Sequence, residues 1–591
     1  MAAYKLEVTT GGLNLSGTLD HVFVTLFGDK GQSERTELDK LGSDFLTGTV
    51  RTYTIKTSSP LGKLLLVKVE KDPHLLLLDD EWFCSKIVVT TPEGESILFP
   101  CYRWISKGEL VELRGGKGLG TELKLKGMLG SDENWQSLDD MKRIFWFRKT
   151  EMSEYVADHW IEDEFYGYQF LNGVNPNAIT KCSELPKNFP VTEEMVKPFL
   201  EGSSLQSEMT KGNIFIYDQK KMEGLPVRDY EGKPLHVTPG LCLLYVNSKQ
   251  NLVPIAIQLH QEPAEENPIF LPSDSETDWL LAKIFIKNAD ALNHQAVTHL
   301  MRTHFLAEVY IVAALRCLPE IHPIYKLLFP HFRYTLHINT GGRKSLFGPD
   351  GALSLGYDGI IELMRRSLAQ ITYSSFFLPE NITARGLDSI PNNYYRDDGL
   401  KLWNIISSFV KTMVEYYYPT DDDVRKDTEL QEWISEIFTH GVLGNKESGF
   451  PTCFRTVEEV IRFITMFIFT VSGQHSAVNN PQYDYCSMMP NYSLLLRKPP
   501  PTSKGQSTKE TILETLPNVG EAVGFVCLIM KNVFLGNYPH ERFDEPVPKK
   551  IIEEFQAKLA NLTKEIEQRN SAAEPPYIYL DPSQMENSIA I

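Results

Sequence analysis

The first part of the chain alternates apolar and polar residues over short runs separated by Gly, Pro and Asp. An alternation with a period of two residues is typical of half-buried strands, and short strands at regular spacing favour a sandwich of two sheets. The alternating runs lie at 4–10, 21–28, 52–57, 63–71, 82–91 and 95–105. We therefore predict a small all-β sandwich at residues 1–114.

Beyond a Gly-rich junction at 114–120, the pattern changes to apolar residues every three or four positions after polar starts. This period is typical of amphipathic helices. The helical runs lie at 137–147, 191–202, 291–319, 357–371, 399–418, 429–441 and 457–480. The pattern thus predicts a second, large and mainly α-helical domain at residues 119–591.

The run at 291–319 carries three histidines at intervals of five residues: His294, His299 and His304. Apolar neighbours indicate a buried helix, and buried imidazoles need partners such as a metal ion. On a regular α-helix, positions i and i+5 lie roughly 140° apart, so they do not share a face. A π-type turn brings them closer. We therefore predict such a turn near His299 and His304 if both bind one metal; incidental buried histidines are the alternative.

A second candidate metal element lies at 457–480, an apolar helix with His475 and Asn479 four residues apart. Residues at i and i+4 share a helix face without distortion. The chain also ends in apolar residues, Asn-Ser-Ile-Ala-Ile. An apolar terminus favours burial, and its carboxylate would then need a cation.

Composition narrows the class of protein. With 591 residues, the chain exceeds what one core usually supports. The net charge of −18 argues against general nucleic-acid affinity. The eight cysteines form no CxxC pair, which is typical of reduced thiols in a cytoplasmic protein. The N-terminus lacks a signal peptide's apolar core, and the most apolar run, 463–471, is too short to span a bilayer.

One loop of the predicted sandwich, 75–82, reads Leu-Leu-Leu-Leu-Asp-Asp-Glu-Trp. Calcium held by the carboxylates, with the leucines entering lipid, would explain this composition. We therefore expect a peripheral contact with a membrane surface. A core strand followed by an acidic turn is the alternative.

Taken together, several motifs resemble the animal lipoxygenases along nearly the whole chain: an N-terminal PLAT (C2-like) sandwich followed by a helical non-haem iron domain. These motifs are specific, and chance agreement across all of them is negligible. They lie at 166–173, 253–259, 266–274, 278–283, 294–304, 322–340, 473–479 and the terminal Ile591.

The resemblance implies one iron per chain. In the family, iron is held by the second and third histidines of the triplet, here His299 and His304. The remaining ligands fall on His475, Asn479 and the carboxylate of Ile591. Three neighbours would support the site without binding the metal: His294, and the glutamines Gln295 and Gln482, which in relatives join the substrate cavity to the coordination sphere.

The resemblance also implies the reaction. Iron removes a hydrogen atom from the bis-allylic carbon of a polyunsaturated fatty acid such as arachidonate or linoleate, and dioxygen then adds to give a hydroperoxide. No separate catalytic side chain is expected, because the cofactor carries the hard chemistry.

Two alternatives to this dioxygenase remain. The C-terminal region looks especially like the epidermis-type branch, which includes R-lipoxygenases and hydroperoxide isomerases that make epoxyalcohols at the same iron. The second alternative is a catalytically impaired membrane- or partner-binding protein. A zinc hydrolase is disfavoured because no Glu stands beside the histidines as a general base.

Gly342 matches the position where relatives with S products usually carry Ala and R-type enzymes carry Gly. The missing methyl would open room for oxygen at another carbon, which favours an R product. Ala291 falls where several relatives close the pocket floor with Phe. The other residues that match the channel lining of relatives are Leu300, Ile338, Leu346 and Leu528.

The chain departs from the family pattern in three places: it is shorter between Trp104 and Trp135, after Leu346 and after Met530. The first shortening puts in doubt the docking of the two domains and the channel entrance. In the sandwich, Leu46 stands where some relatives carry an acid, which weakens the calcium expectation. The candidate calcium ligands are Asp20, Asp44, Asp80 and Glu81.

Overall fold

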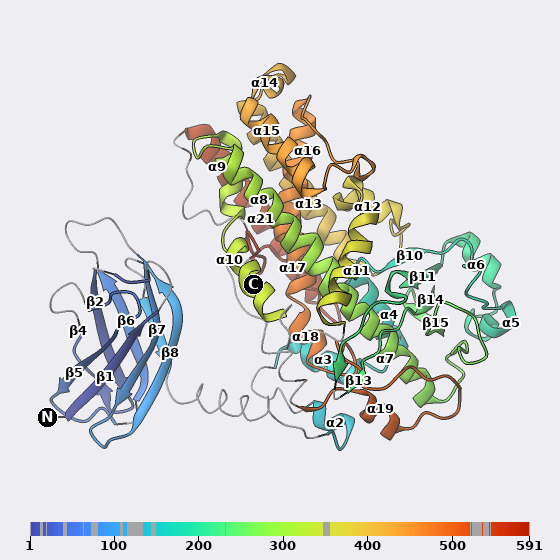
Figure 1. Cartoon of the computed structure of the whole chain (residues 1–591), viewed down its shortest axis with the longest axis horizontal. Helices are drawn as coiled ribbons and strands as arrows, with labels where there is room; N and C mark the ends of the chain where they lie inside the picture. The colour runs from blue at the N-terminus through green and yellow to red at the C-terminus, as the bar shows by residue number, and fades with distance from the viewer. Residues whose placement is uncertain are drawn as a thin grey trace. The chain divides into compact units, whose positions relative to one another are not determined.

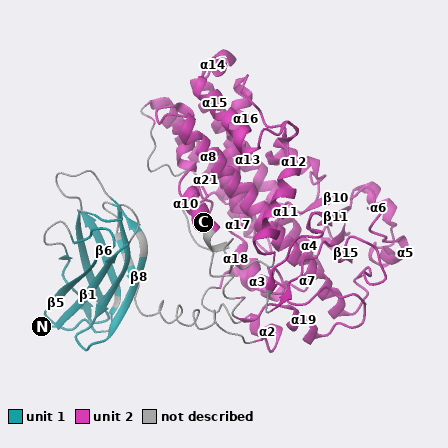
Figure 2. Ribbon diagram, in the orientation of Figure 1, with its two compact units in different colours: residues 1–131 teal, residues 132–591 magenta. Residues whose placement is uncertain are grey.

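The computed structural model divides the chain into two compact units, residues 1–131 and 132–591 (Figure 2). Each unit is described by itself. The structure describes residues 2–11, 16–18, 20–38, 44–62, 64–72, 81–106, 110–114, 134–142, 149–230, 232–346, 355–519, 522, 535, 543 and 545–589.

The first unit is an antiparallel β-sandwich, as the alternating runs predicted (Figure 1). One sheet has the order β5-β1-β7-β8, and the other has the order β3-β2-β6-β9 with β4 also paired to β2. The strands are β1 Ala2–Thr10, β2 His21–Gly28, β3 Gly31–Gln32, β4 Thr36–Glu37, β5 Val50–Thr57, β6 Leu64–Asp72, β7 Trp82–Thr90, β8 Ser96–Ile105 and β9 Leu110–Arg114.

The burial of side chains along β1 follows the predicted period of two residues. In β1, every second side chain from Ala2 to Thr10 is buried in the core between the sheets. Trp82 is fully buried there, and its indole N–H donates to the Thr10 hydroxyl at 3.0 Å. The leucines and acids of the preceding loop, 73–80, lie outside the described residues.

The second unit contains a sheet that the sequence pattern did not predict, with the order β10-β11-β14-β15, and a two-stranded ribbon β12-β13. Strand β14 is buried at all six positions, and β15 at six of seven. Strands buried on both faces show no alternation, so the period-two signal is absent. The strands are β10 Ile179–Lys181, β11 Ile214–Asp218, β12 Asp229–Tyr230, β13 Lys233–Pro234, β14 Leu241–Val246 and β15 Leu252–Gln258.

Helices make up most of the second unit (Figure 1). The α-helices are α2 Leu138–Met141, α3 Glu151–His159, α4 Asp163–Asn172, α5 Glu193–Val196, α6 Leu205–Lys211, α7 Glu276–Asn293, α8 Leu306–Cys317, α9 Pro323–Leu328, α10 Thr335–Leu346, α11 Gly356–Gln370, α12 Leu378–Ala384, α13 Tyr394–Tyr417, α14 Asp421–Lys426, α15 Thr428–Glu436, α16 Val457–Phe469, α17 His475–Asn479, α18 Gln482–Cys486, α19 Lys509–Thr515 and α21 Pro546–Asn570. The π-helical segments are η3 His294–Phe305, η6 Ile437–Gly441 and η8 Thr470–Gln474, and the 3-10 turns are η1 Lys197–Phe199, η2 Lys220–Met222, η4 Phe329–His331, η5 Tyr373–Phe376 and η7 Lys446–Ser448.

The predicted π-type turn at the histidines is confirmed, and it extends over twelve residues. Helix α7 continues without a break into η3 and then into α8, so one helical rod runs from Glu276 to Cys317. A second π-type segment, η8, leads directly into α17. Both histidine-bearing helices therefore contain a widened turn, which places their side chains differently from a regular α-helix.

Asp427, at the start of α15, connects that helix to Tyr418 at the end of α13 and to His322 at the start of α9. One carboxylate oxygen accepts from Leu430 N–H at 2.9 Å and caps α15, while the other accepts from Tyr418 Oη at 2.6 Å and His322 Nε2 at 3.0 Å. Burial by itself would raise the pKa of Asp427, but hydrogen bonds from His322, Tyr418 and Leu430 lower it to about 2. Folding therefore favours the ionised form of the Asp427 carboxylate.

We expect Asp427→Asn to lower the free energy of unfolding of the second unit by about 2 kcal/mol at pH 7. Because the pKa of Asp427 is lower in the folded than in the unfolded chain, the ionised carboxylate stabilises the fold above about pH 4, the unfolded value. This stabilisation is lost as the pH falls toward 2, the folded value. Chemical denaturation at several pH values measures the difference between the variant and the parent. A difference that stays constant between pH 6 and pH 3 would contradict this account.

Candidate metal centre

Three imidazoles converge in the interior of the second unit. Nε2 of His304 lies 3.1 Å from Nε2 of His299 and 3.2 Å from Nε2 of His475. All three side chains are buried. Among the described residues, these histidines form the one group of three or more His, Cys, Asp or Glu side chains close enough to share a metal ion.

The tautomer of His304 is fixed by Asn339 in α10. His304 Nδ1–H donates to Asn339 Oδ1 at 2.9 Å, while Asn339 Nδ2 donates to the His304 carbonyl at 2.9 Å and to Glu308 at 2.7 Å. With its proton on Nδ1, His304 presents a lone pair on Nε2 toward the two other imidazoles. A shared cation is the partner that satisfies such converging nitrogens. The residues present therefore fit a metal ion.

The environment keeps the imidazoles of His299 and His304 neutral. Burial lowers the pKa of His304 to about 4. Burial, together with the neighbouring imidazoles of His304 and His475, holds the pKa of His299 well below its ordinary value. Neutral imidazole is the form that binds metal ions, so no proton has to leave these two nitrogens at neutral pH.

The remaining member of the triplet, His294, points elsewhere. Its Nε2–H donates to the carbonyl of Val478 in α17 at 2.7 Å. Its ring stacks on that of His299 at a centroid distance of 5.7 Å, and burial lowers the pKa of His294 to about 4. His294 thus joins the two histidine-bearing helices without entering the cluster.

A chain of side-chain amides runs beside the cluster. Gln295 Nε2 donates to Gln482 Oε1, and Gln482 Nε2 donates to Asn479 Oδ1 at 2.8 Å. At the other end, Gln295 Oε1 lies 3.4 Å from His299 Nδ1. Asn479 follows His475 by one turn of α17, so both side chains start from one face of that helix.

Hydrogen bonds hold the C-terminal segment in place as far as Ile589. His331 Nδ1–H donates to the carbonyl of Asn587 at 2.7 Å, and Ser588 Oγ donates to the carbonyl of Arg333 at 2.8 Å. Thr335 Oγ1 donates to the carbonyl of Ile589 at 3.2 Å. The predicted ligand Ile591 lies outside the described residues.

The predicted channel residues fall on the elements around the cluster. Ala291 is fully buried in α7, and Leu300 is buried in η3. Ile338 and Gly342 are half-buried in α10, the helix that also carries Asn339. The side chain of Leu346 and all of Leu528 lie outside the described residues.

The described acids of the sandwich do not gather into a cation site. Asp20 is buried and paired with the fully buried Lys71 at 2.8 Å. Asp44 accepts from Tyr53 Oη at 3.1 Å, and Glu81 accepts from Ser106 Oγ at 3.1 Å. Asp80 lies outside the described residues, and Leu46 is 48% exposed. Asp20 is thus already neutralised by an internal cation.

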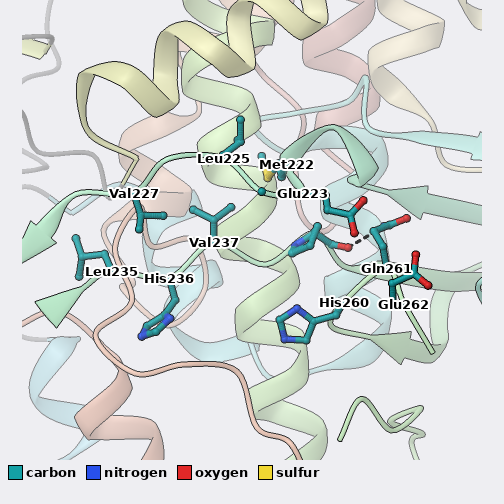
Figure 3. Close-up of a pocket in the computed structure, with 12 residues that line it drawn as sticks. Met222, Glu223, Leu225, Val227, Leu235, His236, Val237, His260, Gln261 and Glu262 are labelled. Atoms are coloured by element: carbon teal, nitrogen blue, oxygen red, sulfur yellow. Dashed lines mark hydrogen bonds between the residues drawn. The ribbon is translucent and has the colours of Figure 1, made fainter. Parts of the chain in front are cut away.

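A separate pocket of about 440 Å³ lies at the segments 222–239 and 260–262 (Figure 3). Apolar side chains such as Leu225 and Val237 line it together with His236 and His260, whose pKa values burial lowers. None of the predicted iron or channel residues contributes to its walls. This pocket is therefore distinct from the histidine cluster.

Comparison with known families agrees with both units. Residues 120–575 match the lipoxygenase family model, and residues 4–112 match the PLAT/LH2 domain model. The chain belongs to the lipoxygenase family. The resemblance drawn from the sequence motifs, and the fold class with it, is confirmed.

Curated relatives align with this lipoxygenase over its whole sequence. It is 39% identical over 711 positions to the hydroperoxide isomerase ALOXE3 of Rattus norvegicus, and 36% identical over 702 positions to the arachidonate 12-lipoxygenase, 12R-type, of Mus musculus, with 100% of each chain covered. Against the first relative, 711 aligned positions and 591 residues leave 120 positions without a residue of this chain.

Solved structures give the same result. A calcium-dependent 11R-lipoxygenase matches with a TM-score of 0.76 at 31% identity, and the coral 8R-lipoxygenase with 0.76 at 32%, each with full coverage of both chains. In the described part of this lipoxygenase, no helix combines the length and apolar character needed to cross a bilayer.

Asn339 is a supporting residue that the sequence did not reveal, because its partner His304 lies 35 residues away. Loss of a partner that orients a metal-binding histidine typically costs 10–100-fold in metal affinity or activity. We expect Asn339→Ala to weaken iron binding by about that factor. Asn339→Asp keeps the acceptor oxygen and is the matched control. Chelator competition measures the affinity, and equal iron affinity in Asn339→Ala and the parent would contradict this role.

Proposed function

We propose that this lipoxygenase binds one non-haem iron and converts polyunsaturated fatty acids to hydroperoxides. The observation that carries the proposal is the convergence of three imidazoles, His299, His304 and His475, in a buried site. Asn479 and the carboxylate of Ile591 complete the proposed ligand set. Imidazole, amide and carboxylate donors suit iron and leave room for a further ligand.

Iron bound there would supply the one-electron chemistry that removes a hydrogen atom from a bis-allylic carbon and prepares it for dioxygen. The protein's own residues hold and orient the site. Asn339 keeps the His304 lone pair directed inward, and the amide chain from Gln295 through Gln482 to Asn479 joins the cluster to a neighbouring helix. The side chains of Ala291 in α7 and Leu300 in η3 are buried and limit the access of water to the metal site.

The carbon that reacts and the chirality of the product depend on the space beside the cluster. We assign this selection to Gly342 and Ile338 on α10, together with Ala291, Leu300, Leu346 and Leu528. Gly342 favours an R product, a preference in line with the 12R-type relative. Arachidonate and linoleate are the substrates to test first.

A second activity, isomerisation of hydroperoxides to epoxyalcohols, is favoured by the relative named hydroperoxide isomerase. Purified, iron-loaded protein given fatty acid and oxygen should produce conjugated-diene absorbance. Given a fatty acid hydroperoxide without oxygen, an isomerase should instead remove that absorbing species and form epoxyalcohol. Absence of both conversions would contradict the proposed function.

The non-catalytic alternative, a protein that binds membranes or partners with an impaired iron domain, predicts a folded chain without iron. Metal analysis of the purified protein distinguishes an iron enzyme from such a non-catalytic protein. We expect close to one iron per chain, and a folded protein that takes up no iron when supplied with it would favour the alternative.

We further propose that the sandwich, residues 1–114, docks the catalytic domain, residues 119–591, onto membranes from the cytoplasm. The related structures include a calcium-dependent lipoxygenase. In this chain, Asp44, Asp80 and Glu81 are the candidate calcium ligands, whereas Asp20 is paired with Lys71. Vesicle sedimentation with calcium or with a chelator tests the metal requirement.

A further inference from the structure

Tyr492 connects the proposed iron site to a buried carboxylate. It follows α18, in the segment 487–496, and is itself buried. Its ring centroid lies 6.1 Å from that of His294, with the two planes at 68°, and its hydroxyl donates to Asp290 Oδ2 at 3.0 Å. Asp290 and His294 stand four residues apart on the helical rod, so they share one face and a single tyrosine contacts both.

A continuous set of rings leads from Tyr492 to the histidine cluster. The His294 imidazole is stacked on that of His299, a proposed iron ligand, with centroids 5.7 Å apart and planes at 6°. The His299 ring lies 4.7 Å from the His304 ring. Rings at such centroid separations are in direct contact, without water between them. Because electrons tunnel efficiently between aromatic rings in contact, Tyr492 can exchange an electron with the metal site.

Asp290 is placed to accept the phenol proton of Tyr492. Its Oδ1 accepts from Asn175 Nδ2 at 2.7 Å, which leaves Oδ2 for the Tyr492 hydroxyl. Burial raises the pKa of Asp290, and the charge of Lys287 and the two hydrogen bonds oppose this rise. Burial also lowers the pKa of Lys287 to about 8. Lys287 is therefore mainly cationic at neutral pH and favours the ionised carboxylate.

A buried tyrosine gives up an electron readily only when its proton can leave as well. Removal of the electron alone would leave a phenol radical cation, and an isolated charge is costly in an apolar interior. Transfer of the proton along the hydrogen bond to Asp290 gives a neutral tyrosyl radical instead. Tyr310 on α8 provides the contrast. It is also buried, but its hydroxyl has no hydrogen-bond partner in the described part of the chain.

From this arrangement, we propose that Tyr492 is a one-electron donor that reduces a fatty alkoxyl radical formed when a fatty acid hydroperoxide is cleaved at the metal site. The inference rests on the proposed function, because that function supplies both the iron and the hydroperoxide. It gives Tyr492 a role outside the oxygenation itself: the radical is quenched before it attacks the protein.

Reduction of the hydroperoxide to an alcohol and water takes two electrons and two protons. The first electron comes from bound ferrous iron, which becomes ferric. The O–O bond breaks, and one solvent proton gives water and a fatty alkoxyl radical. The second electron comes from Tyr492 through His294 and His299. The phenol O–H bond breaks, its proton passes to Asp290 Oδ2, and a second solvent proton converts the alkoxyl oxygen to an alcohol.

Freeze-quench EPR spectroscopy of the full-length, iron-loaded protein tests this role, with linoleic acid hydroperoxide added in the absence of oxygen. We expect a tyrosyl radical signal that narrows when the protein contains ring-deuterated tyrosine, which distinguishes it from a lipid radical. The same preparation is assayed for conversion of linoleate and of the hydroperoxide. Conversion without a tyrosyl signal would overturn this inference alone, whereas failure of both conversions would contradict the proposed function and the inference with it.

Three substitutions locate the radical. Tyr492→Phe keeps the ring beside His294 but lacks the hydroxyl, and it should abolish the tyrosyl signal. Asp290→Asn keeps a hydrogen-bond acceptor but removes the base, and it should abolish the signal as well. Tyr310→Phe, the matched control, removes a buried hydroxyl that has no proton acceptor, and it should keep the parental intensity. A full signal in Tyr492→Phe or Asp290→Asn, or its loss from folded, iron-loaded Tyr310→Phe, would overturn the assignment.

Discussion

His304→Ala should leave this lipoxygenase without bound iron and lower lipid oxygenation by more than a hundredfold. His304 Nε2 is the nitrogen that lies within 3.2 Å of both other imidazoles. Loss of an outer partner already costs 10–100-fold, so loss of a direct ligand should cost more. Metal analysis after dialysis and oxygen consumption with arachidonate measure the two effects.

The matched control is His294→Gln. This residue stands on the same helical rod, at the same interval of five, but its imidazole donates to the Val478 carbonyl. A glutamine amide can make that hydrogen bond, so the variant should retain iron. Full iron occupancy in His304→Ala, or complete loss of iron from folded His294→Gln, would contradict the division of roles within the triplet.

Gly342→Ala should change the product from mainly R to mainly S and move oxygen to another carbon. The added methyl narrows the space beside α10, the helix that holds His304 through Asn339. Because both faces of the substrate compete for oxygen, a barrier difference of about 1.4 kcal/mol changes their ratio tenfold. Chiral-phase chromatography of the reduced products gives the ratio directly.

Gly341→Ala is the control that the chain itself offers. A Cβ added there meets no atom within 4 Å beyond its own turns of helix, so the substitution should be tolerated and should leave chirality unchanged. Both variants gain the same helix propensity from Gly to Ala. An identical shift in both would mean that helix stiffening, and not oxygen access, sets the product.

Much of the fold could be predicted because its signals are local. Alternation in β1 and the interval of five between His299 and His304 depend on neighbouring residues, and the sandwich and the π-type turn followed from them. The sheet of the second unit was missed because strand β14 is buried on both faces and its sequence shows no period of two.

The missed parts of the site depend on contacts between distant residues. Asn339 acts on His304 across 35 positions, and Lys71 neutralises Asp20 across 51. No pattern along one segment contains such a pair.

The long helical rod has a consequence for how this chain can change in length. A π-type turn accommodates an extra residue, and each residue turns a helix by about 100°. Deleting one residue within η3 would therefore rotate either the histidines away from the metal or the buried face of α8 away from α15. The chain lacks 120 positions relative to a full-length relative, and the shortenings read from its motifs fall outside this rod. Along residues 294–305 the phase of the helix is fixed from both ends, by the histidines on one side and by the packing of α8 on the other.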